Sequence, residues 1–302
     1  MSVVADPSLG LPEAREGVQL EGPRRHGVLR ALWKHPRGRI GCVLVGLVVL
    51  LAIAGATGLT PYSPQLQNPL AVLKAPSLAH PLGTDQFGRD ELSMVFQGLF
   101  VSLEIACLAV AIAGVVGTVA GIVAGYLGRW PSAVIMRVTD MLFAIPAILM
   151  ALAIVTALGP GWLNTALAIG VGYIPIFVRI VRGPVLSLRE SAYVRAGRVL
   201  GFSNVRLLFR HVLPNVAGIV AVQVMMALAW SILAEAALSF LGLGPPPPMA
   251  SLGEMVSQSS SLAATAWWTL AAPSIAIVMA VIGFNLLGDG LRDAVDPRTQ
   301  SR

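Results

Sequence analysis

The chain has 302 residues, of which 56% are hydrophobic and 12% are charged, and its mean hydropathy is +0.77. Apolar runs of about 18 or more residues recur along the whole length, which excludes a pair of water-soluble domains and predicts an all-α polytopic membrane protein. The net charge of +6 does not indicate a nucleic-acid partner, because the basic residues follow membrane topology instead.

Residues 1–39 form a polar leader. Residues 1–22 show no hydrophobic periodicity, which predicts disorder, whereas residues 24–39 are basic and carry Trp33, which suits a short helix on a membrane surface. The first long apolar run starts too late, is too long and lacks a small-residue cleavage site, so we expect no cleavable signal peptide.

Six apolar stretches predict six membrane-spanning helices. They cover residues 40–59, 100–126, 138–158, 164–180, 216–241 and 269–288. Pro146 falls inside the third stretch and Pro175 inside the fourth, and each predicts a kinked helix. Gly117, Gly121 and Gly125 lie four residues apart in the second stretch, which predicts the close approach of a neighbouring helix.

The connections between these stretches define the domain organisation. The expected parts are a cytoplasmic leader (1–39), a first transmembrane helix (40–59), an extracytoplasmic segment (60–99), a core transmembrane domain (100–290) with a cytoplasmic loop at 183–215 and an extracytoplasmic loop at 242–266, and a cytoplasmic tail (291–302). Pro61, Pro64 and Pro69 predict an extended start to the outer segment.

Orientation follows from the positions of the basic residues. Six spans place both termini on one side of the membrane, and every Lys and Arg except Lys74 and Arg89 then falls on that side. We therefore expect a multi-pass membrane protein with both termini in the cytoplasm. Trp267 and Trp268 precede the last span, where an aromatic belt is typical.

The loop at 183–215 is a charged island between apolar spans. The loop has one acidic residue, Glu190, and five arginines. The arginines are Arg189, Arg195, Arg198, Arg206 and Arg210. Gly201 fits the left-handed stop of a helix that covers residues 186–200. Ser203 is expected to cap a second short helix at residues 204–212, and Pro214 is expected to end it.

This second helix is predicted to be amphipathic. Val205, Leu208 and Phe209 fall on one side, and Arg206 and Arg210 fall on another. A short amphipathic helix that projects from a membrane domain is a surface that a soluble partner can bind. The alternative is a basic cytoplasmic loop that only satisfies topology.

No catalytic or metal-binding motif is present. The two lysines, Lys34 and Lys74, do not follow a glycine, so the chain has no Walker A loop, and any ATP and magnesium are expected on another polypeptide. Cys42 and Cys107 lie inside apolar runs, and the histidines are scattered, so we expect no metal and no bound cofactor. The chain is interpreted as a non-catalytic membrane subunit.

A few polar residues fall near membrane depth, namely Glu104, Asp140, Glu235, Asn285 and Asp289. Glu104 and Glu235 either line a path or pair within the helix bundle. Asp140 and Asp289 either lie at helix ends or form the carboxyl pair of an intramembrane aspartyl protease. An ion-driven secondary transporter is a further alternative, but it should show inverted repeats and buried charge at mid-membrane, which the sequence does not clearly show.

The outer segment contains the run HPLGTDQFGRDELS. Its candidate residues combine glycines for tight turns with charges that can pair with one another, and they are Gly83, Thr84, Asp85, Gly88, Arg89 and Asp90.

The charged loop resembles the EAA loop of ABC importer permeases. The run AGRVLG, nine further residues and HVLPN place Gly201, Leu213 and Pro214 at the spacing of that motif. Where the motif has Glu-Ala-Ala, this chain has Arg195, Ala196 and Gly197.

The resemblance extends from about residue 30 to residue 298. The runs LGTDQFGRD, DMLFAIPAIL, LSFLGLG and NLLGDGLRDAVDPR occur in the order found in the C-type permeases of dipeptide and oligopeptide ABC importers. The resemblance implies a type I permease fold in the lipid bilayer of a bacterial inner membrane. It also implies a second homologous permease subunit, two cytoplasmic ABC ATPase subunits and an extracytoplasmic solute-binding protein.

The same resemblance implies a role for each of the two unusual stretches. The coupling helix that docks on an ATPase would be residues 203–210, with Ser203, Asn204, Val205, Arg206, Leu208, Phe209 and Arg210. The outer run would face the solute-binding protein. Dipeptides, longer peptides, nickel chelates and haem all remain open as cargo.

Overall fold

The structure is a computed structural model that describes residues 32–33, 35–246 and 248–295. These residues form an α-helical bundle in which the only β-type pairing is an isolated bridge between Thr84 and Asp90. Five of the described helices are long and apolar enough to cross a membrane, and a bent pair of helices makes up to six. The all-α polytopic fold is therefore confirmed.

The helices and short turns lie in the following order. They are α2 (Pro36–Thr57), η1 (Pro69–Ala71), α3 (Glu91–Tyr126), α4 (Arg129–Phe143), α5 (Ala147–Leu158), α6 (Trp162–Arg189), α7 (Ala192–Val199), α8 (Asn204–Leu207), the π-helical turn η2 (Leu208–Val212), α9 (Leu213–Phe240), α10 (Leu252–Ser259), η3 (Ser260–Leu262) and α11 (Trp267–Val295).

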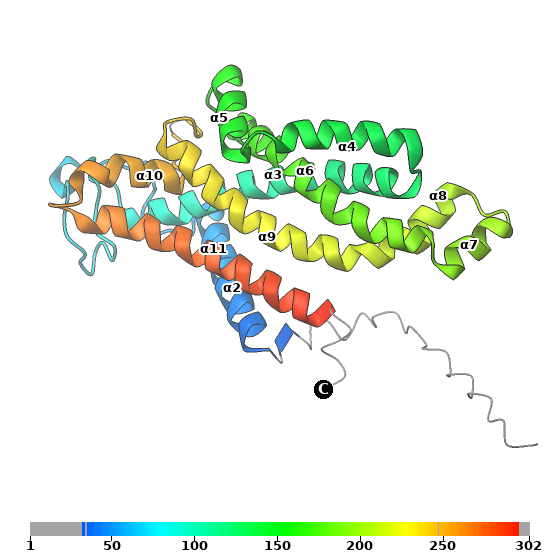
Figure 1. Ribbon diagram of the computed structural model, residues 1–302. Helices are drawn as coiled ribbons and strands as arrows, with labels where there is room; N and C mark the ends of the chain where they lie inside the picture. The colour runs from blue at the N-terminus through cyan, green and yellow to red at the C-terminus, as the bar shows by residue number, and fades with distance from the viewer. Residues whose placement is uncertain (1–31, 34, 247, 296–302) are drawn as a thin grey trace, which may run out of the picture.

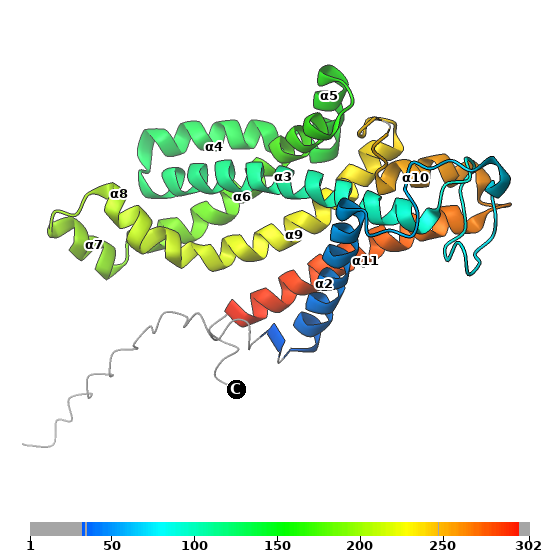
Figure 2. The ribbon, with the colours of Figure 1, turned by 180° about the vertical axis from the view of Figure 1, so that it is seen from behind.

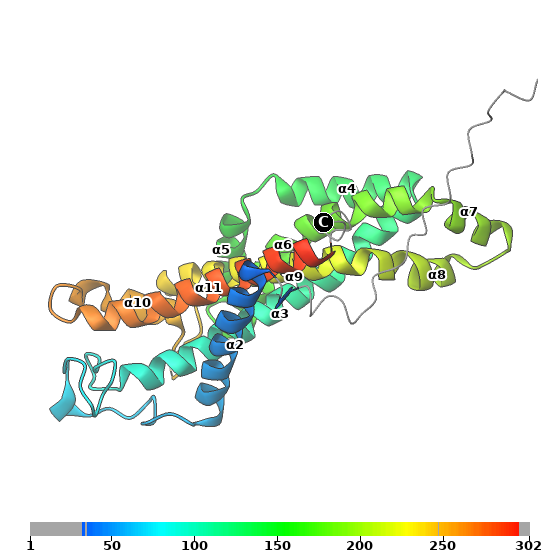
Figure 3. The same cartoon turned by 90° about the horizontal axis from the view of Figure 1, so that it is seen from below.

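Helices α3, α6 and α9 form the centre of the bundle, and α2 and α11 pack along one side of it (Figures 1 and 2). The loops that carry α7 and α8 lie at one end of the molecule, and α10 and the segment after α2 lie at the other end (Figure 3). The two stretches that the sequence singles out therefore occupy opposite ends.

Glycines set the distance between α3 and α6. A Cβ atom added to Gly121 would lie 2.8 Å from the carbonyl oxygen of Val178, and one added to Gly125 would lie 2.7 Å from a methyl group of Val185. A Cβ atom at Gly117 would collide with Phe177. The close approach predicted from the spacing of these glycines is confirmed, and α6 is the helix that approaches.

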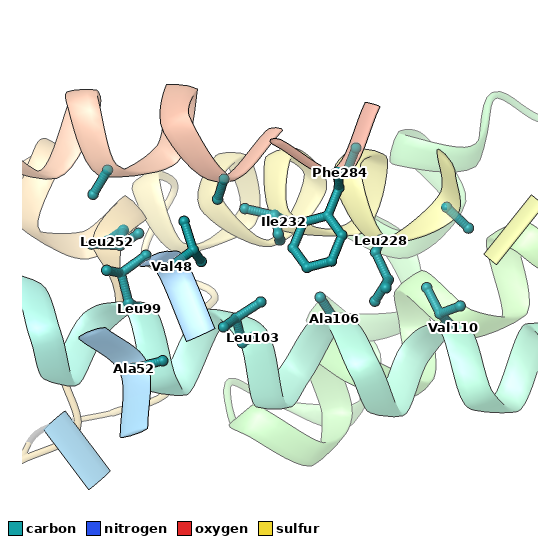
Figure 4. Packing of buried hydrophobic residues seen from close by; sticks show 14 of the residues in the cluster. Val48, Ala52, Leu99, Leu103, Ala106, Val110, Leu228, Ile232, Leu252 and Phe284 are labelled. Atoms are coloured by element: carbon teal, nitrogen blue, oxygen red, sulfur yellow. The ribbon is translucent and has the colours of Figure 1, made fainter. Parts of the chain in front are cut away.

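The largest apolar cluster joins α2, α3, α9 and α11 (Figure 4). Val48 of α2, Leu103 of α3 and Ile232 of α9 are buried there, together with Phe284 of α11. Because lipid is as apolar as these side chains, close packing rather than the hydrophobic effect stabilises such contacts between spans. The outward side chains of α2, such as Leu50, remain exposed and are free to face lipid.

The prediction that the third span is a single kinked helix is wrong. Residues 138–158 are divided between α4 and α5, whose axes differ by 85°. Pro146 lies at the N-cap of α5, where it has no N–H to donate and restricts the residue before it, so the chain turns there. Pro175 and Pro184, by contrast, lie inside a continuous α6.

Several predicted boundaries also differ from the structure. Helix α3 begins at Glu91 rather than at residue 100, because the Asp90 side chain accepts a hydrogen bond from the Ser93 N–H and caps an earlier turn. Helix α6 continues to Arg189, and α11 continues to Val295, so both enter segments predicted to be loop or tail.

The outer loop at 242–266 contains α10, which Ser251 caps through the Glu254 N–H. The predictions for most of the leader and for the last residues of the tail lie outside the described residues.

Candidate functional site

The charged loop forms the end of the bundle at which α6 ends and α9 begins (Figure 1). Gly201 has a φ of 78°, and the N–H groups of Gly201 and Phe202 donate to the carbonyls of Arg198 and Gly197. The Ser203 Oγ accepts a hydrogen bond from the Arg206 N–H at 3.3 Å. The predicted glycine stop and serine cap are therefore confirmed. The prediction of one helix over residues 186–200 is wrong, because these residues are divided between α6, which ends at Arg189, and α7 (Ala192–Val199).

The prediction that Pro214 ends a separate short helix is wrong. Helix α8, the π turn and α9 form one helical segment from Asn204 to Phe240. Pro214 lies in the first turn of α9, where its missing N–H is tolerated, and the Leu213 N–H reaches back five residues to the Leu208 carbonyl. The candidate coupling helix is thus the end of a membrane-spanning helix.

An apolar cluster fixes the loop to the bundle. Val194 of α7, Leu207 of α8 and Val212 of the π turn are fully buried, and they pack with Tyr126 of α3 and Val185 of α6. The sequence does not indicate that Leu207 is buried, because the π turn interrupts the helical periodicity between Leu207 and the buried positions of α9.

Leu207 also explains an unusual residue of the motif. A Cβ atom added to Gly197 would lie 2.7 Å from the Leu207 Cδ2. Gly197 replaces the alanine of the EAA motif at this position, and the space that the alanine methyl group would need is occupied by Leu207.

A polar contact ties the loop to α3. The Tyr126 hydroxyl donates to the Asn204 Oδ1 at 3.2 Å, and the Arg198 Nε donates to the Tyr126 oxygen at 3.4 Å. The Arg198 guanidinium also lies over the Tyr126 ring, 5.0 Å from its centroid. The sequence gives no local signal for Tyr126, because its partners lie more than one span away along the chain.

The outward side of the loop combines apolar side chains with arginines. Val199 is 88% exposed, Leu200 72%, Phe209 68% and Val205 63%. We call these four residues the tip surface. Four further exposed residues surround this surface: Arg195, Ala196, Arg206 and Arg210. Of the predicted apolar face, Val205 and Phe209 point outward, whereas Leu208 is half-buried against the Leu207 cluster.

The outer run is held by its own hydrogen bonds. The Asp85 Oδ2 pairs with the Arg89 Nε at 2.6 Å, and its Oδ1 accepts the N–H groups of Phe87 and Arg89 at 2.8 Å each. Gly83 and Gly88 take φ values of 79° and 70°, which fit glycine. The predicted tight turns and the predicted self-pairing of charges are present.

The other residues of the run join it to neighbouring segments. Asp90 pairs with the His80 Nδ1 at 2.9 Å in addition to capping α3. The buried Thr84 donates to the Ala71 carbonyl, and its own carbonyl accepts the Trp268 Nε1–H at 3.2 Å. The run therefore connects the segment after α2, the start of α3 and the start of α11.

The carboxylates near membrane depth do not form a catalytic pair. The Asp140 Oδ1 lies 2.7 Å from the Arg179 Nη2 on α6. Asp289 belongs to α11, which packs on α2 and α9, whereas α4 packs on α3 and α6. No observation on the described residues favours the aspartyl protease.

Glu235 forms a buried hydrogen-bonded group within the bundle. It is fully buried, and its carboxyl oxygens accept hydrogen bonds from the Ser102 and Ser239 hydroxyls, each at 2.7 Å. Glu235 thus pairs within the bundle, which was one of its two predicted roles. Glu104 and Asn285 are half-buried and make no side-chain hydrogen bond with the described residues.

The described part of the chain brings no three His, Cys, Asp or Glu side chains together in a metal-binding arrangement. The two unusual features are therefore surfaces: the tip surface with its apolar anchor at one end, and the hydrogen-bonded run at the other.

Comparison with known proteins identifies the family. Residues 117–301, more than half of the chain, match the family described as binding-protein-dependent transport system inner membrane component. The chain belongs to this family. This binding-protein-dependent permease is an ABC importer permease subunit, which confirms the resemblance stated from the sequence motifs.

Named relatives match this permease over most of its length. The dipeptide transport system permease protein DppC of Alkalihalophilus pseudofirmus is 41% identical over 272 residues, which cover 90% of this chain and 89% of the relative. The glutathione transport system permease protein GsiD of Pectobacterium atrosepticum is 40% identical over 276 residues, covering 90% and 92%. The di/tripeptide transport system permease protein DppC of Pseudomonas aeruginosa is 36% identical over 282 residues, covering 90% and 93%.

Proposed function

We propose that this permease subunit imports short peptides as one of two homologous permeases, which work with two cytoplasmic ABC ATPases and an extracytoplasmic solute-binding protein. The names of the relatives support the peptide cargo. The observation that carries the ATPase partnership is the tip surface, where Val205 and Phe209 are exposed at the end of a helix that continues through the bundle.

The tip surface is suited to docking in a groove on an ATPase. Exposed apolar side chains surrounded by polar ones are typical of protein interaction sites. The groove would have to bind Phe209 differently in the two nucleotide states, because only a difference in binding free energy can shift the permease between conformations. ATP and magnesium are expected on the partner chains, not on this one.

The continuity from α8 to α9 supports a direct mechanical route. A displacement of Phe209 is carried along α9, because backbone hydrogen bonds run through the π turn into the membrane helix. Leu207 and Asn204 carry the same displacement to α3 and α6 through their contacts with Tyr126 and the buried cluster. Alternating access would follow from such rigid movements of packed helices.

The arginines support the orientation. The tip surface lies at the end rich in Arg, which we assign to the cytoplasm together with both termini. The outer run then faces the solute-binding protein. Phe87 is exposed in the run, and Leu70 and Leu78 are exposed in the segment before it.

The first test is co-purification of the chain, tagged at its C-terminus, from native membranes in mild detergent. A second permease and one or two ATPases should accompany it and be identified by mass spectrometry. Recovery of the chain alone in several detergents would refute the proposal.

The second test concerns coupling. Phe209→Ala should leave the complex assembled but should uncouple ATP hydrolysis from peptide uptake in proteoliposomes. Phe240→Ala is the matched control, because Phe240 is an exposed phenylalanine at the other end of the same helical segment. Wild-type uptake by an assembled Phe209→Ala complex would contradict the assigned role of the tip surface.

A further inference from the structure

Two cavities lie end to end along the groove between α6 and α9. The larger has a volume of about 960 Å³, and its walls are α6, α9 and the last turn of α11. The smaller has a volume of about 410 Å³, and its walls are α5, α6 and α9. Tyr173 of α6 and Trp230 of α9 line both cavities.

The order of the lining residues fixes the direction of the groove. On α9 the larger cavity is lined from Asn215 to Trp230, and the smaller cavity from Trp230 to Ala237. Helix α6 runs the opposite way, with Ile180 in the larger cavity and Ile169 in the smaller. The larger cavity therefore lies toward the charged loop, and the smaller cavity lies toward the opposite end of the bundle. Tyr173 and Trp230 lie between the two cavities.

The two cavities differ in chemistry. The larger is lined by the polar side chains of Asn215, Gln223 and Arg292, and its described lining contains no Asp or Glu. The smaller is lined, apart from the two shared aromatic residues, only by Ala, Ile and Leu. A polar solute would be stable in the first cavity, whereas the second would exclude water and ions.

Gln223 is the polar group best placed to recognise a solute. It belongs to the interior of an apolar membrane helix, where polar side chains typically face a water-filled cavity and mark a functional site. Its side chain makes no hydrogen bond with the described residues. A carboxamide offers both an acceptor and donors, which complement the N–H and C=O of a peptide bond.

We propose that Tyr173 and Trp230 form an aromatic barrier across the transport path, and that the larger cavity, with Gln223 as its peptide-binding group, is this chain's part of the cytoplasmic compartment of that path. This inference rests on the proposed function, since the partner permease would close the open side. The exposed Arg292 at the mouth would attract the free carboxylate of a peptide. The cavity volume is within the range of small-molecule sites, about 300–1,000 Å³.

Cysteine labelling tests the barrier. Cys42 and Cys107 are the only cysteines, so Cys42→Ala and Cys107→Ala give a cysteine-free background for the full chain in its complex. Met226→Cys places a thiol in the larger cavity, and Ala234→Cys places one in the smaller. Inverted membrane vesicles without nucleotide are treated with a membrane-impermeant methanethiosulfonate reagent.

We expect Met226→Cys to be labelled and Ala234→Cys to remain unlabelled. Adding Trp230→Ala should make Ala234→Cys reactive, whereas Trp230→Phe should not. Trp267→Ala is the matched control, because Trp267 has a similar exposure but lies at the outer start of α11. Equal labelling of both positions in the wild-type background, or no effect of Trp230→Ala, would overturn the barrier.

Peptide uptake tests Gln223. Gln223→Leu keeps the size of the side chain but removes its hydrogen bonds, and we expect uptake at low peptide concentration to fall about tenfold. Val278→Leu changes an exposed apolar residue of α11 that lines neither cavity, and it should have no such effect. Full uptake by Gln223→Leu would refute the recognition role.

Failure of this inference can be told apart from failure of the proposed function. If the ATPases do not co-purify, the importer complex itself is rejected, whatever the labelling pattern. If the complex assembles and its ATPase activity responds to the binding protein, an altered labelling or uptake pattern rejects only the barrier or the role of Gln223.

Discussion

Leu207→Ala should detach the charged loop from the bundle. Truncation of a buried leucine to alanine costs about 2–5 kcal/mol, and Leu207 is fully buried in the cluster that joins α7 and α8 to α3 and α6. We expect about 3 kcal/mol, because the short elements of the loop can relax only partly around the cavity. The cost should appear as local opening of the loop rather than as unfolding of the membrane helices.

Hydrogen exchange measured by mass spectrometry provides the assay. About 3 kcal/mol corresponds to roughly a hundredfold larger open population, so peptides from Ala192–Val199 should exchange about a hundredfold faster. Val205→Ala is the control on the same helix, because an exposed side chain should change stability by at most about 0.5 kcal/mol. Equal protection of the loop in both variants would refute the assignment of Leu207 as its anchor.

Three further predictions concern the bundle and its outer end. Gly121→Leu should prevent α3 from packing on α6 and should lower the yield of monodisperse protein. Gly46→Leu is the control, because a Cβ atom at Gly46 meets nothing within 4 Å. Equal yields of the two variants would contradict the role of the glycines. Asp90→Ala should lower the Tm by removing the cap of α3, which is worth about 1 kcal/mol, whereas Asp90→Asn can still accept the capping hydrogen bond; an unchanged Tm in the alanine variant would argue against the cap. Burial raises the pKa of the Glu254 carboxyl above its unfolded value, so its contribution to stability is present in acid and is lost as pH rises through the folded pKa. Glu254→Gln should therefore raise the Tm more at neutral pH than at a pH below the pKa of Glu254 in the unfolded chain. A change in Tm that does not depend on pH would contradict the raised pKa.

The sequence predicts those features that depend on local chemistry. The positive φ of Gly201, the cap formed by Ser203 and the close approach at Gly121 follow from residue type and spacing alone. The apolar runs predict the spans, because a helix makes all of its backbone hydrogen bonds within one segment and therefore leaves no unpaired N–H or C=O group in lipid.

Features that depend on tertiary contacts were not predictable in the same way. Pro146 and Pro175 look equivalent in the sequence, yet one marks an 85° turn and the other lies in a continuous helix. Proline favours a break at both positions, and contacts with neighbouring helices can keep a helix continuous in spite of it. The pairing of Tyr126 with Asn204 joins residues that are 78 positions apart, and no local pattern reports it. The π turn that joins Leu208 to Leu213 has no periodic signal of its own.

The glycines of α3 restrict how the transport path can open. Because the glycine positions of α3 lie against the backbone and side chains of α6, a rotation of α3 about its own axis would bring residues with larger side chains into contacts that only glycine accommodates. This packing resists rotation of α3 against α6. We therefore expect the change that exposes the path to either side of the membrane to occur at the other face of α6, where it meets α9 and the α4–α5 corner.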